Sequence, residues 1–596
     1  MSWKPQRTLA ETETLLTSPG SIHEVETTLV DGRLYRVYKN LWPSLREFWL
    51  SAVSQYSGDT YIVYEDQRLT YRQVHDRAIK VATMFRSVYE IKKGDRVGIC
   101  SRNCPEYLVA FWACHLIGAV SVLLNAWLPL EPLRHCFAHT QCKLVILDPE
   151  RADILEKAVS KISFTTEVKG FLVFEFKDSV KRWEGMKSFE QKLNDDHGDE
   201  SEMIDSAISI LPEDNATLIF TSGTTGLPKG VLSTQRQFLT NVLNVLVGGF
   251  RASLRRGEDF PTIQRIGPQK ATLVTVPLFH VTGSTSFSMM ATMTGMKIVM
   301  TRKWDIEEGI IQENVAVAGG VPSMVTDLTL SSLVGHPLEG LLFGGAPAPD
   351  TLVTRARKAF PTATMIQGYG LTETNSIAVS VAGEDYIVRP ASTGRASPVN
   401  EIKIVHENTC LATGAVGEVW LRGPNVMKGY WREPEATNAV ITKDGWLRTG
   451  DVGYLDDEGF LYIKDRREFV KDIIIRGGEN VDSVTVENAL YADPRVLEAA
   501  AVGVPDERLG ELVAAIVSIR PTYEGQVTEA TLIAHAKSRL PKFAVPVMVV
   551  ILNSTFERTP SGKIIKGELR KIAKSHWELR RRGGIGKAGR EPLANL

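Results

Sequence analysis

Residues 219–231 have the sequence Ile-Phe-Thr-Ser-Gly-Thr-Thr-Gly-Leu-Pro-Lys-Gly-Val, and they decide which fold to expect. The short apolar run that ends at Phe220 predicts a buried strand, and a loop of glycine and hydroxyl residues follows it directly. Glycines let backbone N–H groups approach an anion closely, hydroxyls add hydrogen-bond donors, and Lys229 adds a positive charge. The stretch therefore predicts a phosphate-binding loop, with candidate ligands Thr221, Ser222, Gly223, Thr224, Thr225, Gly226 and Lys229.

The loop is not a Walker A motif, because Pro228 stands five residues after Gly223, where that motif requires its second glycine. A flexible linker has a similar composition, but linkers rarely follow an apolar strand so directly. The phosphate loop is therefore the better interpretation.

At 596 residues the chain is too long for a single hydrophobic core, so we expect two or more domains. A net charge of −1 with 23% charged residues gives no reason to expect a nucleic-acid partner. Six cysteines and no export signal in residues 1–14 favour a reducing compartment, and we predict a cytoplasmic protein. The run Ala594-Asn595-Leu596 weakly resembles a peroxisomal signal and leaves that location as the alternative.

One stretch approaches the length of a transmembrane helix. Residues 107–124 carry no formal charge over 18 residues. They also contain His115 and Gly118, and the run 121–124 beyond the glycine resembles a strand. A buried helix followed by a core strand is the better interpretation, and we expect no membrane span.

Apolar strands alternate with helical patterns from about residue 40 to 405, which predicts an α/β architecture with largely parallel sheets. Residues 250–271 interrupt that pattern and suggest a surface insertion. Short strands with Gly and Asp turns follow, and a small α+β domain is expected after Arg466. The basic stretch after Leu569 is expected to be solvated and partly disordered.

Further segments share the character of the phosphate loop. Gly344-Gly345-Ala346-Pro347 follows an apolar run and predicts a tight turn against which a flat ring can lie. Residues 367–373, Gln-Gly-Tyr-Gly-Leu-Thr-Glu, supply an aromatic face for a base and a carboxylate for Mg²⁺. Asp451 offers an acceptor for two sugar hydroxyls, Arg466 a guanidinium for ribose or phosphate, and Lys563 lies on an expected turn. Each segment alone has a structural explanation, but six of them in one order are hard to dismiss.

With these motifs the chain resembles the adenylate-forming superfamily of acyl- and aryl-CoA ligases, luciferases and peptide-synthetase adenylation domains. The resemblance covers residues 45–570 and rests on Thr-Ser-Gly-Thr-Thr-Gly-Leu-Pro-Lys-Gly, Tyr-Gly-Leu-Thr-Glu-Thr, Arg-Thr-Gly-Asp, Arg-Gly-Gly-Glu-Asn and Pro-Ser-Gly-Lys. It implies an α/β fold, with a large N-terminal domain of two α/β sheets plus a β-barrel and a small mobile α+β C-terminal domain. The domains are expected at residues 1–466 and 467–570, followed by a basic tail at 571–596.

The resemblance also implies the reaction of an ATP-dependent carboxylic acid:CoA ligase. A carboxylate attacks the α-phosphate of ATP, giving acyl-AMP and pyrophosphate, and coenzyme A then displaces AMP. The expected catalytic residues are Lys563, Glu373 and His280, and the expected Mg²⁺ ligands are Glu373 and Thr225. ATP is expected to contact the phosphate loop and Gly345, Ala346, Pro347, Gln367, Gly368, Tyr369, Gly370, Leu371, Thr372, Asp451 and Arg466.

The expected acyl pocket is lined by residues 279–283, 319–322 and 344–345. In amino-acid-activating relatives an aspartate follows the phenylalanine and pairs with the substrate ammonium, whereas this chain has His280. An ammonium buried without a counter-charge costs several kcal/mol, so we expect a fatty or aryl-alkanoic acid. His280 is expected to gate the pocket or meet the carboxylate, and a packed histidine at a strand end is the alternative.

Two departures from the superfamily pattern fall near the expected hinge. Extra residues separate Arg466 from Lys471, and no Tyr-Pro follows residues 477–480. They leave the hinge position and the CoA contacts open. Two alternative functions also stay open: transfer of the acyl group to another acceptor, and silent binding of an acyl group or nucleotide. The joint retention of Lys563, Glu373, Asp451 and Arg466 argues against silent binding, which needs no lysine on a mobile domain.

Overall fold

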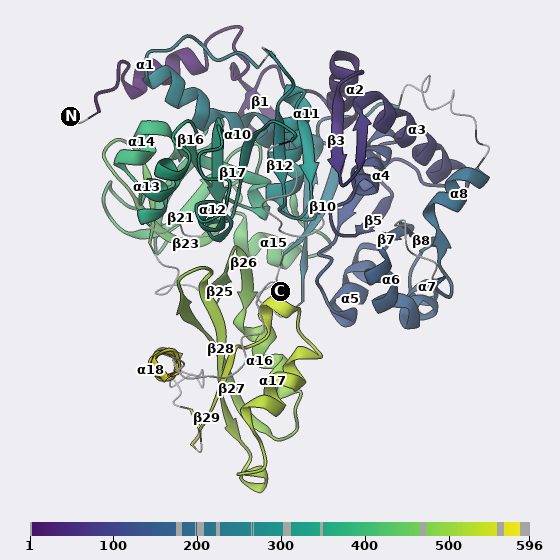
Figure 1. The fold of residues 1–596 in the computed structure, drawn as a ribbon, viewed down its shortest axis with the longest axis vertical. Helices are drawn as coiled ribbons and strands as arrows, with labels where there is room; N and C mark the ends of the chain where they lie inside the picture. The colour runs from purple at the N-terminus through teal and green to yellow at the C-terminus, as the bar shows by residue number, and fades with distance from the viewer. Residues whose placement is uncertain are drawn as a thin grey trace. The chain divides into compact units, whose positions relative to one another are not determined.

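The computed structural model describes residues 3–174, 182–196, 198, 208–221, 227–263, 265, 267–301, 312–345, 350–464, 473–552, 554–556 and 566–583. The chain forms two compact units. The larger contains Met1–Ala126, Cys136–Thr221 and Gly230–Phe469, and the smaller contains Trp127–His135, Ser222–Lys229 and Val470–Leu596. Figure 1 gives the order of helices and strands along the chain.

The first sheet of the larger unit carries the strand predicted before the phosphate loop. Among the described residues its order is β22 (Gly429–Tyr430), β11 (Lys229–Thr234), β10 (Asn215–Thr221), β6 (Val120–Leu123), β5 (Arg96–Cys100), β7 (Leu144–Leu147), β8 (Gly170–Val173) and β9 (Lys187–Ser188). The pairings from β10 through to β9 are parallel, and β22 is antiparallel to β11. The strand predicted for the apolar run that ends at Phe220 is therefore confirmed, and so is the largely parallel sheet.

The second sheet of the larger unit carries both glycine-rich motifs. Its described strands follow the order β18 (Arg395–Ala396), β17 (Ser376–Ala382), β16 (Thr364–Leu371), β15 (Gly340–Gly344), β14 (Val315–Gly320), β12 (Ala271–Val274), β13 (Lys297–Met300), β3 (Thr60–Tyr64) and β4 (Gln67–Thr70). The pairings from β16 to β3 are parallel. Because parallel strands end at one edge of a sheet, the motifs after β15 and within β16 lie together.

One hydrophobic core joins both sheets and the helices α2 (Leu45–Tyr56), α3 (Tyr71–Ser87), α4 (Pro105–Leu116) and α11 (Ser288–Thr294). Trp49 of α2 stacks on Trp112 of α4 with ring centroids 4.5 Å apart. Helix α4 is buried along its length and precedes β6, which confirms the buried-helix interpretation of residues 107–124. None of the helices in the described part of the chain has the length and apolar character needed to cross a bilayer.

A third, antiparallel sheet of the larger unit carries Asp451. Its order is β20 (Thr409–Cys410), β19 (Glu401–His406), β21 (Gly417–Arg422), β23 (Leu447–Leu455) and β24 (Leu461–Lys464). The superfamily resemblance implies a barrel in this region. Within the described residues the sheet is open, with β20 and β24 at its edges.

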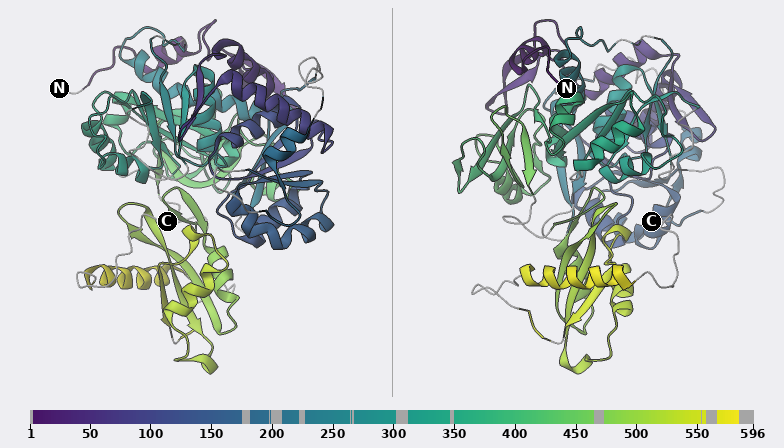
Figure 2. Two further views of the ribbon diagram at one scale, coloured as in Figure 1. Left: turned by 45° about the vertical axis from the view of Figure 1, so that its right-hand side comes forward. Right: turned by 60° about the vertical axis from the view of Figure 1, so that its left-hand side comes forward.

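The smaller unit is a sheet covered on both faces by helices. The strands are β26 (Glu479–Asp482), β25 (Ile473–Arg476), β28 (Gly510–Ile519), β27 (Val496–Asp506) and β29 (Met548–Leu552). One face packs against α16 (Ser483–Tyr491) and α17 (Glu529–Lys537), and the other against α18 (Lys566–Gly583) (Figure 2). The stretch after Leu569, which was expected to be solvated and partly disordered, is helical as far as Gly583: α18 buries Ala573, and its Trp577 Nε1 donates to Pro505 O at 2.9 Å.

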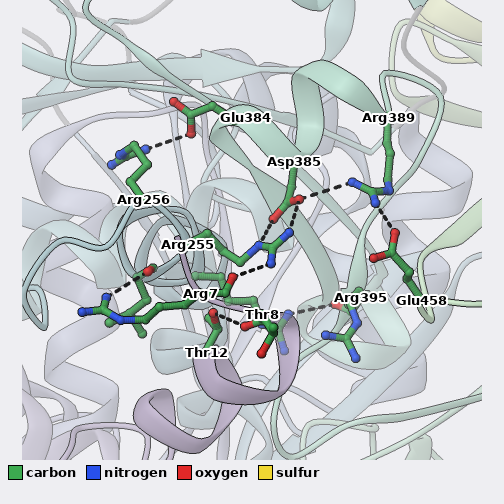
Figure 3. Close-up of polar contacts among 12 residues, drawn as sticks. Arg7, Thr8, Thr12, Arg255, Arg256, Glu384, Asp385, Arg389, Arg395 and Glu458 are labelled. Atoms are coloured by element: carbon green, nitrogen blue, oxygen red, sulfur yellow. Dashed lines mark hydrogen bonds and ion pairs between the residues drawn. The ribbon is translucent and has the colours of Figure 1, made fainter. Parts of the chain in front are cut away.

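The expected surface insertion at residues 250–271 is also wrong in its first part. Residues 250–255 complete the helix α10 (Gln235–Arg255), and the N-terminal helix α1 (Leu9–Leu16) packs against it. Arg255 is buried, and the two carboxylate oxygens of Asp385 compensate its charge by accepting hydrogen bonds from its Nε and Nη2 at 2.9 and 3.1 Å. Asp385 lies on α14 (Gly383–Val388). Figure 3 shows the surrounding arginine cluster, defined as Arg255, Arg256, Arg389, Glu384, Asp385 and Glu458.

Candidate functional site

The predicted phosphate loop connects two neighbouring strands of the first sheet. Strand β10 ends at Thr221 and β11 begins at Lys229. The other expected phosphate ligands lie outside the described residues: Ser222, Gly223, Thr224, Thr225 and Gly226. The strand before the loop is thus confirmed, and the roles of the loop residues stay predictions.

The second sheet brings the two glycine-rich motifs together. Gly344 at the end of β15 is in parallel register with Gly368 of β16, and a Cβ on Gly344 would lie 2.4 Å from the Gly368 carbonyl oxygen. A Cβ on Gly370 would lie 1.5 Å from the Ser376 carbonyl oxygen. Only glycine fits at these two positions. Gln367, Tyr369 and Leu371 also belong to β16, whereas Ala346 and Pro347, which follow Gly345, lie outside the described residues.

Gln367 contributes a buried acceptor to this edge of the sheet. The residue is 5% exposed, and among the described residues its Oε1 has no hydrogen-bond partner. Buried side-chain oxygens without partners are rare in native proteins. The atom therefore fits a ligand that brings its own N–H or O–H donor.

Glu373 lies in the 3₁₀ turn Thr372–Thr374, directly after β16. Its main-chain oxygen accepts a hydrogen bond from Met427 N at 2.7 Å, and its carboxylate Oε1 accepts one from Tyr430 Oη at 2.8 Å. In the described part of the chain no Lys or Arg forms an ion pair with this carboxylate. A carboxylate that neighbouring cations do not neutralise suits a hard divalent cation such as Mg²⁺.

Asp451 lies in β23 and is 1% exposed. Its Oδ2 accepts a hydrogen bond from Tyr369 Oη at 2.7 Å, so the structure brings together the candidates for base and sugar binding. The backbone N–H of Asp451 donates to Thr449 Oγ1 at 3.0 Å, and that hydroxyl donates to Val419 O at 2.6 Å. These bonds fix the backbone directly before the carboxylate.

His280 precedes a π-helix, Thr282–Phe287. Its carbonyl oxygen accepts hydrogen bonds from the backbone N–H and the hydroxyl of Ser284, each at 2.9 Å. Thr285 Oγ1 in turn donates to Asn375 O at 3.0 Å. The structure therefore connects the helix after His280 to the turn that carries Glu373. Short π-helical segments are frequent at functional sites. The role of the His280 imidazole stays a prediction.

Two expected site residues, Lys563 and Arg466, lie outside the described residues, and so does the hinge candidate Lys471. Their roles stay predictions. Sequence reasoning also missed Tyr430 and Asn425, which hold the Glu373 turn through their side chains. The one signal for Tyr430 was its place after Gly429, a pattern too common to assign a role.

Comparison with known proteins identifies the family. The model of the AMP-binding enzyme family matches residues 49–431, and the model of the AMP-binding enzyme C-terminal domain matches residues 485–563. This chain belongs to the AMP-binding enzyme family. The expected membership of the adenylate-forming superfamily is confirmed, together with the α/β fold class.

Two curated relatives of this AMP-binding enzyme are similar over nearly their whole length. A 2-succinylbenzoate–CoA ligase of Bacillus velezensis is 30% identical over 532 residues, which cover 88% of this chain and 98% of the relative. The long-chain-fatty-acid–CoA ligase FadD13 of Mycobacterium tuberculosis is 30% identical over 514 residues, which cover 85% and 93%. Both are CoA ligases, the class that the sequence motifs imply.

Solved structures give the same fold. A double mutant of o-succinylbenzoate CoA synthetase from Bacillus subtilis, bound with its product analogue, matches with a TM-score of 0.74 at 27% identity, covering 89% of this chain and 99% of that one. The same Bacillus subtilis enzyme in complex with ATP and magnesium matches with a TM-score of 0.60 at 27% identity, covering 89% and 99%. The amide bond synthetase McbA from Marinactinospora thermotolerans matches with a TM-score of 0.73 at 25% identity, covering 88% and 99%.

Proposed function

We propose that this AMP-binding enzyme is an ATP-dependent carboxylic acid:CoA ligase that activates a fatty or aryl-alkanoic acid as acyl-AMP and then forms the acyl-CoA thioester. One observation carries the proposal. Tyr369 of β16 donates a hydrogen bond to Asp451 of β23, and Glu373 follows β16 directly; these residue types suit a base, a ribose and a metal-bound phosphate, which supports the proposal. The naming of both relatives as CoA ligases supports the choice of acceptor.

In the first step a carboxylate oxygen of the acid attacks the α-phosphorus of ATP, and the bond to pyrophosphate breaks. A carboxylate is a weak nucleophile that the triphosphate repels, so alignment and charge neutralisation supply most of the catalysis. Lys563 bridges the carboxylate and the α-phosphate, and the loop from Thr221 to Lys229 binds the departing pyrophosphate. Gln367 Oε1 supplies a hydrogen-bond acceptor for an amino group of the base.

Glu373 and Thr225 offer hard oxygen donors that fit Mg²⁺. When bound, the ion neutralises charge on the phosphates. In the second step the sulfur of CoA attacks the acyl carbonyl carbon, the bond to AMP breaks, and the thiol proton is lost. AMP departs with one oxygen of the original carboxylate.

The substrate is proposed from the residues near His280. An ammonium group would find no counter-carboxylate at that position, which disfavours an amino acid. The relatives are named for a succinylbenzoate and a long-chain fatty acid, both carboxylic acids with large apolar parts. We keep the cytoplasm as the proposed location, on the cysteine content alone.

A second candidate is an enzyme that passes the acyl group to an amine instead of CoA. The likeness to the amide bond synthetase favours it, because that enzyme has the same fold at 25% identity. The two candidates share the first step and differ only in the nucleophile of the second.

Pyrophosphate release across a panel of carboxylic acids, with and without CoA, tests the proposal. Release that depends on one acid class and accelerates with CoA supports the ligase. Release that CoA does not change, but an amine accelerates, supports the second candidate. No release with any acid in the panel contradicts both.

Lys563→Ala tests the assignment of the lysine to the first step. We expect pyrophosphate release to fall about 10²–10³-fold, since one charge contact at the transition state is lost. Thioester formation from supplied acyl-AMP should stay close to the wild-type rate. An equal loss in both half-reactions contradicts the assignment.

A further inference from the structure

We infer that Tyr430 is a positioning residue for the Glu373 carboxylate, holding it through a hydrogen bond so that its second oxygen is ready for the metal. The inference rests on the proposed function, in which Glu373 binds Mg²⁺. Tyr430 lies outside every glycine-rich motif that the sequence singles out. It would not touch substrate, so its effect passes through Glu373.

The hydrogen bond has a fixed direction. Tyr430 Oη lies 2.8 Å from Glu373 Oε1. The phenol hydroxyl carries a hydrogen and the carboxylate offers only acceptor oxygens, so the tyrosine donates and Glu373 accepts.

The segment that carries Tyr430 also holds the main chain of the Glu373 turn. Met427 N donates to Glu373 O at 2.7 Å, and Asn425 Nδ2 donates to Thr374 O at 2.8 Å. Asn375 Nδ2 returns a bond to Asn425 O at 3.0 Å. Backbone and side chain of Glu373 are thus oriented by one continuous segment, which leaves the carboxylate little freedom to rotate.

The same segment is anchored to the strand that follows the phosphate loop. Tyr430 is in register with Val231 in the β22–β11 pairing. Trp431 N donates to Gly230 O at 2.7 Å, and Lys428 N donates to Leu232 O at 2.9 Å. Tyr430 therefore connects the first sheet, through β11, to the carboxylate at the edge of the second sheet. The hydroxyl of Tyr430 therefore makes a specific polar contact and does not merely fill space.

The chemistry of the pair suits a metal ligand. A neutral hydroxyl orients the carboxylate and leaves its charge intact, whereas a lysine or arginine would neutralise that charge. Partners that orient a metal ligand from behind commonly affect metal affinity by about 10–100-fold when removed. Loss of the Tyr430 hydroxyl should therefore weaken metal binding and leave nucleotide binding without metal unchanged.

Three single variants test this with Mn²⁺ as the probe. Tyr430→Phe keeps the ring and removes only the hydroxyl, and Glu373→Gln removes the proposed ligand charge. Tyr462→Phe is the matched control, because Tyr462 Oη also donates to a carboxylate, Asp456 Oδ2, at 3.3 Å but away from Glu373. The Kd of Mn²⁺ is measured by electron paramagnetic resonance with a non-hydrolysable ATP analogue present, and the Kd of the analogue is measured with EDTA.

We expect Tyr430→Phe to raise the Mn²⁺ Kd about tenfold, Glu373→Gln to raise it at least as much, and Tyr462→Phe to leave it unchanged. None should change the Kd of the metal-free analogue. A Glu373→Gln effect without a Tyr430→Phe effect overturns the inference and leaves the proposed function intact. Unchanged Mn²⁺ binding in Glu373→Gln overturns the metal assignment itself, and the inference with it.

Discussion

The larger unit contains two polar clusters that treat their carboxylates in opposite ways. In the arginine cluster each carboxylate meets a guanidinium, as Asp385 meets both Arg255 and Arg389 (Figure 3). In the candidate site the carboxylates of Glu373 and Asp451 instead receive hydroxyl donors from tyrosines. The guanidinium partners of the first cluster neutralise charge, whereas the tyrosine hydroxyls of the second orient the carboxylates without themselves neutralising charge.

The different partners of these carboxylates indicate that the arginine cluster serves stability and the candidate site serves function. Buried ion pairs hold elements together, but breaking one is costly because the remaining charge is stranded. A carboxylate held by a hydroxyl is well suited to meet a cation or a sugar that arrives with the substrate. Variants in the arginine cluster should therefore change stability, and variants in the site should change activity.

The largest effect is expected from Asp385→Asn in the arginine cluster. The substitution leaves the buried guanidinium of Arg255 without its counter-charge, and we expect the free energy of unfolding to fall by about 3–5 kcal/mol. Urea unfolding measures it. Glu458→Gln is the control, because the Glu458 side chain is 52% exposed and its pair with Arg389 should contribute less than about 1 kcal/mol. Similar losses in both variants would contradict the distinction.

Glu373→Gln should reduce activity and leave stability nearly unchanged. Loss of the charge proposed to hold Mg²⁺ should reduce acid-dependent pyrophosphate release by about 10²–10³-fold. The melting temperature should stay near that of the wild type, since no described cation depends on Glu373. A variant that loses activity only in proportion to its unfolded fraction would place Glu373 with the structural carboxylates.

The pH dependence of stability should come from buried neutral groups. Burial lowers the pKa of His23 to about 4 and that of His115 to about 3. Both folded values lie below the unfolded value of about 6.5, so the unfolded chain binds protons more readily as pH falls. Their contribution to stability is complete above about pH 6.5 and is lost progressively toward pH 4.

Each histidine should add about 1.4 kcal/mol per pH unit to the slope of the unfolding free energy between about pH 5.5 and 4.5. Urea unfolding of the wild type and of His115→Asn at several pH values measures the difference. The variant should show a shallower slope by that amount. Equal slopes would mean that His115 binds protons equally well in the folded and unfolded states.

Tyr369→Phe should give the smallest effect. The ring remains available for the base, and only the hydrogen bond to Asp451 is lost, which corresponds to about 0.5–1.5 kcal/mol. We expect the KM for ATP to rise about three- to tenfold with kcat nearly unchanged. A large fall in kcat would show that the hydroxyl acts in the chemical step and not only in orienting Asp451.

Local sequence predicted the strand ends well and the long-range contacts poorly. The apolar run to Phe220 carries its structure within a few residues, and its strand is confirmed. The Gly-Tyr-Gly motif lies in β16, a strand that was not predicted from the sequence. Tyr430 lies 57 residues from Glu373, and no local sequence pattern predicts the hydrogen bond between them. The interrupted pattern at residues 250–271 suggested a surface insertion, because nothing local shows that Arg251 and Arg255 have buried partners on other elements.

Isotope transfer tests whether the acid is activated as an acyl-AMP. The acid found in the substrate panel is supplied with ¹⁸O in both carboxylate positions, and the products with CoA are analysed by mass spectrometry. We expect one ¹⁸O atom in each AMP released and one in each thioester. AMP without ¹⁸O, or label in orthophosphate, would contradict it.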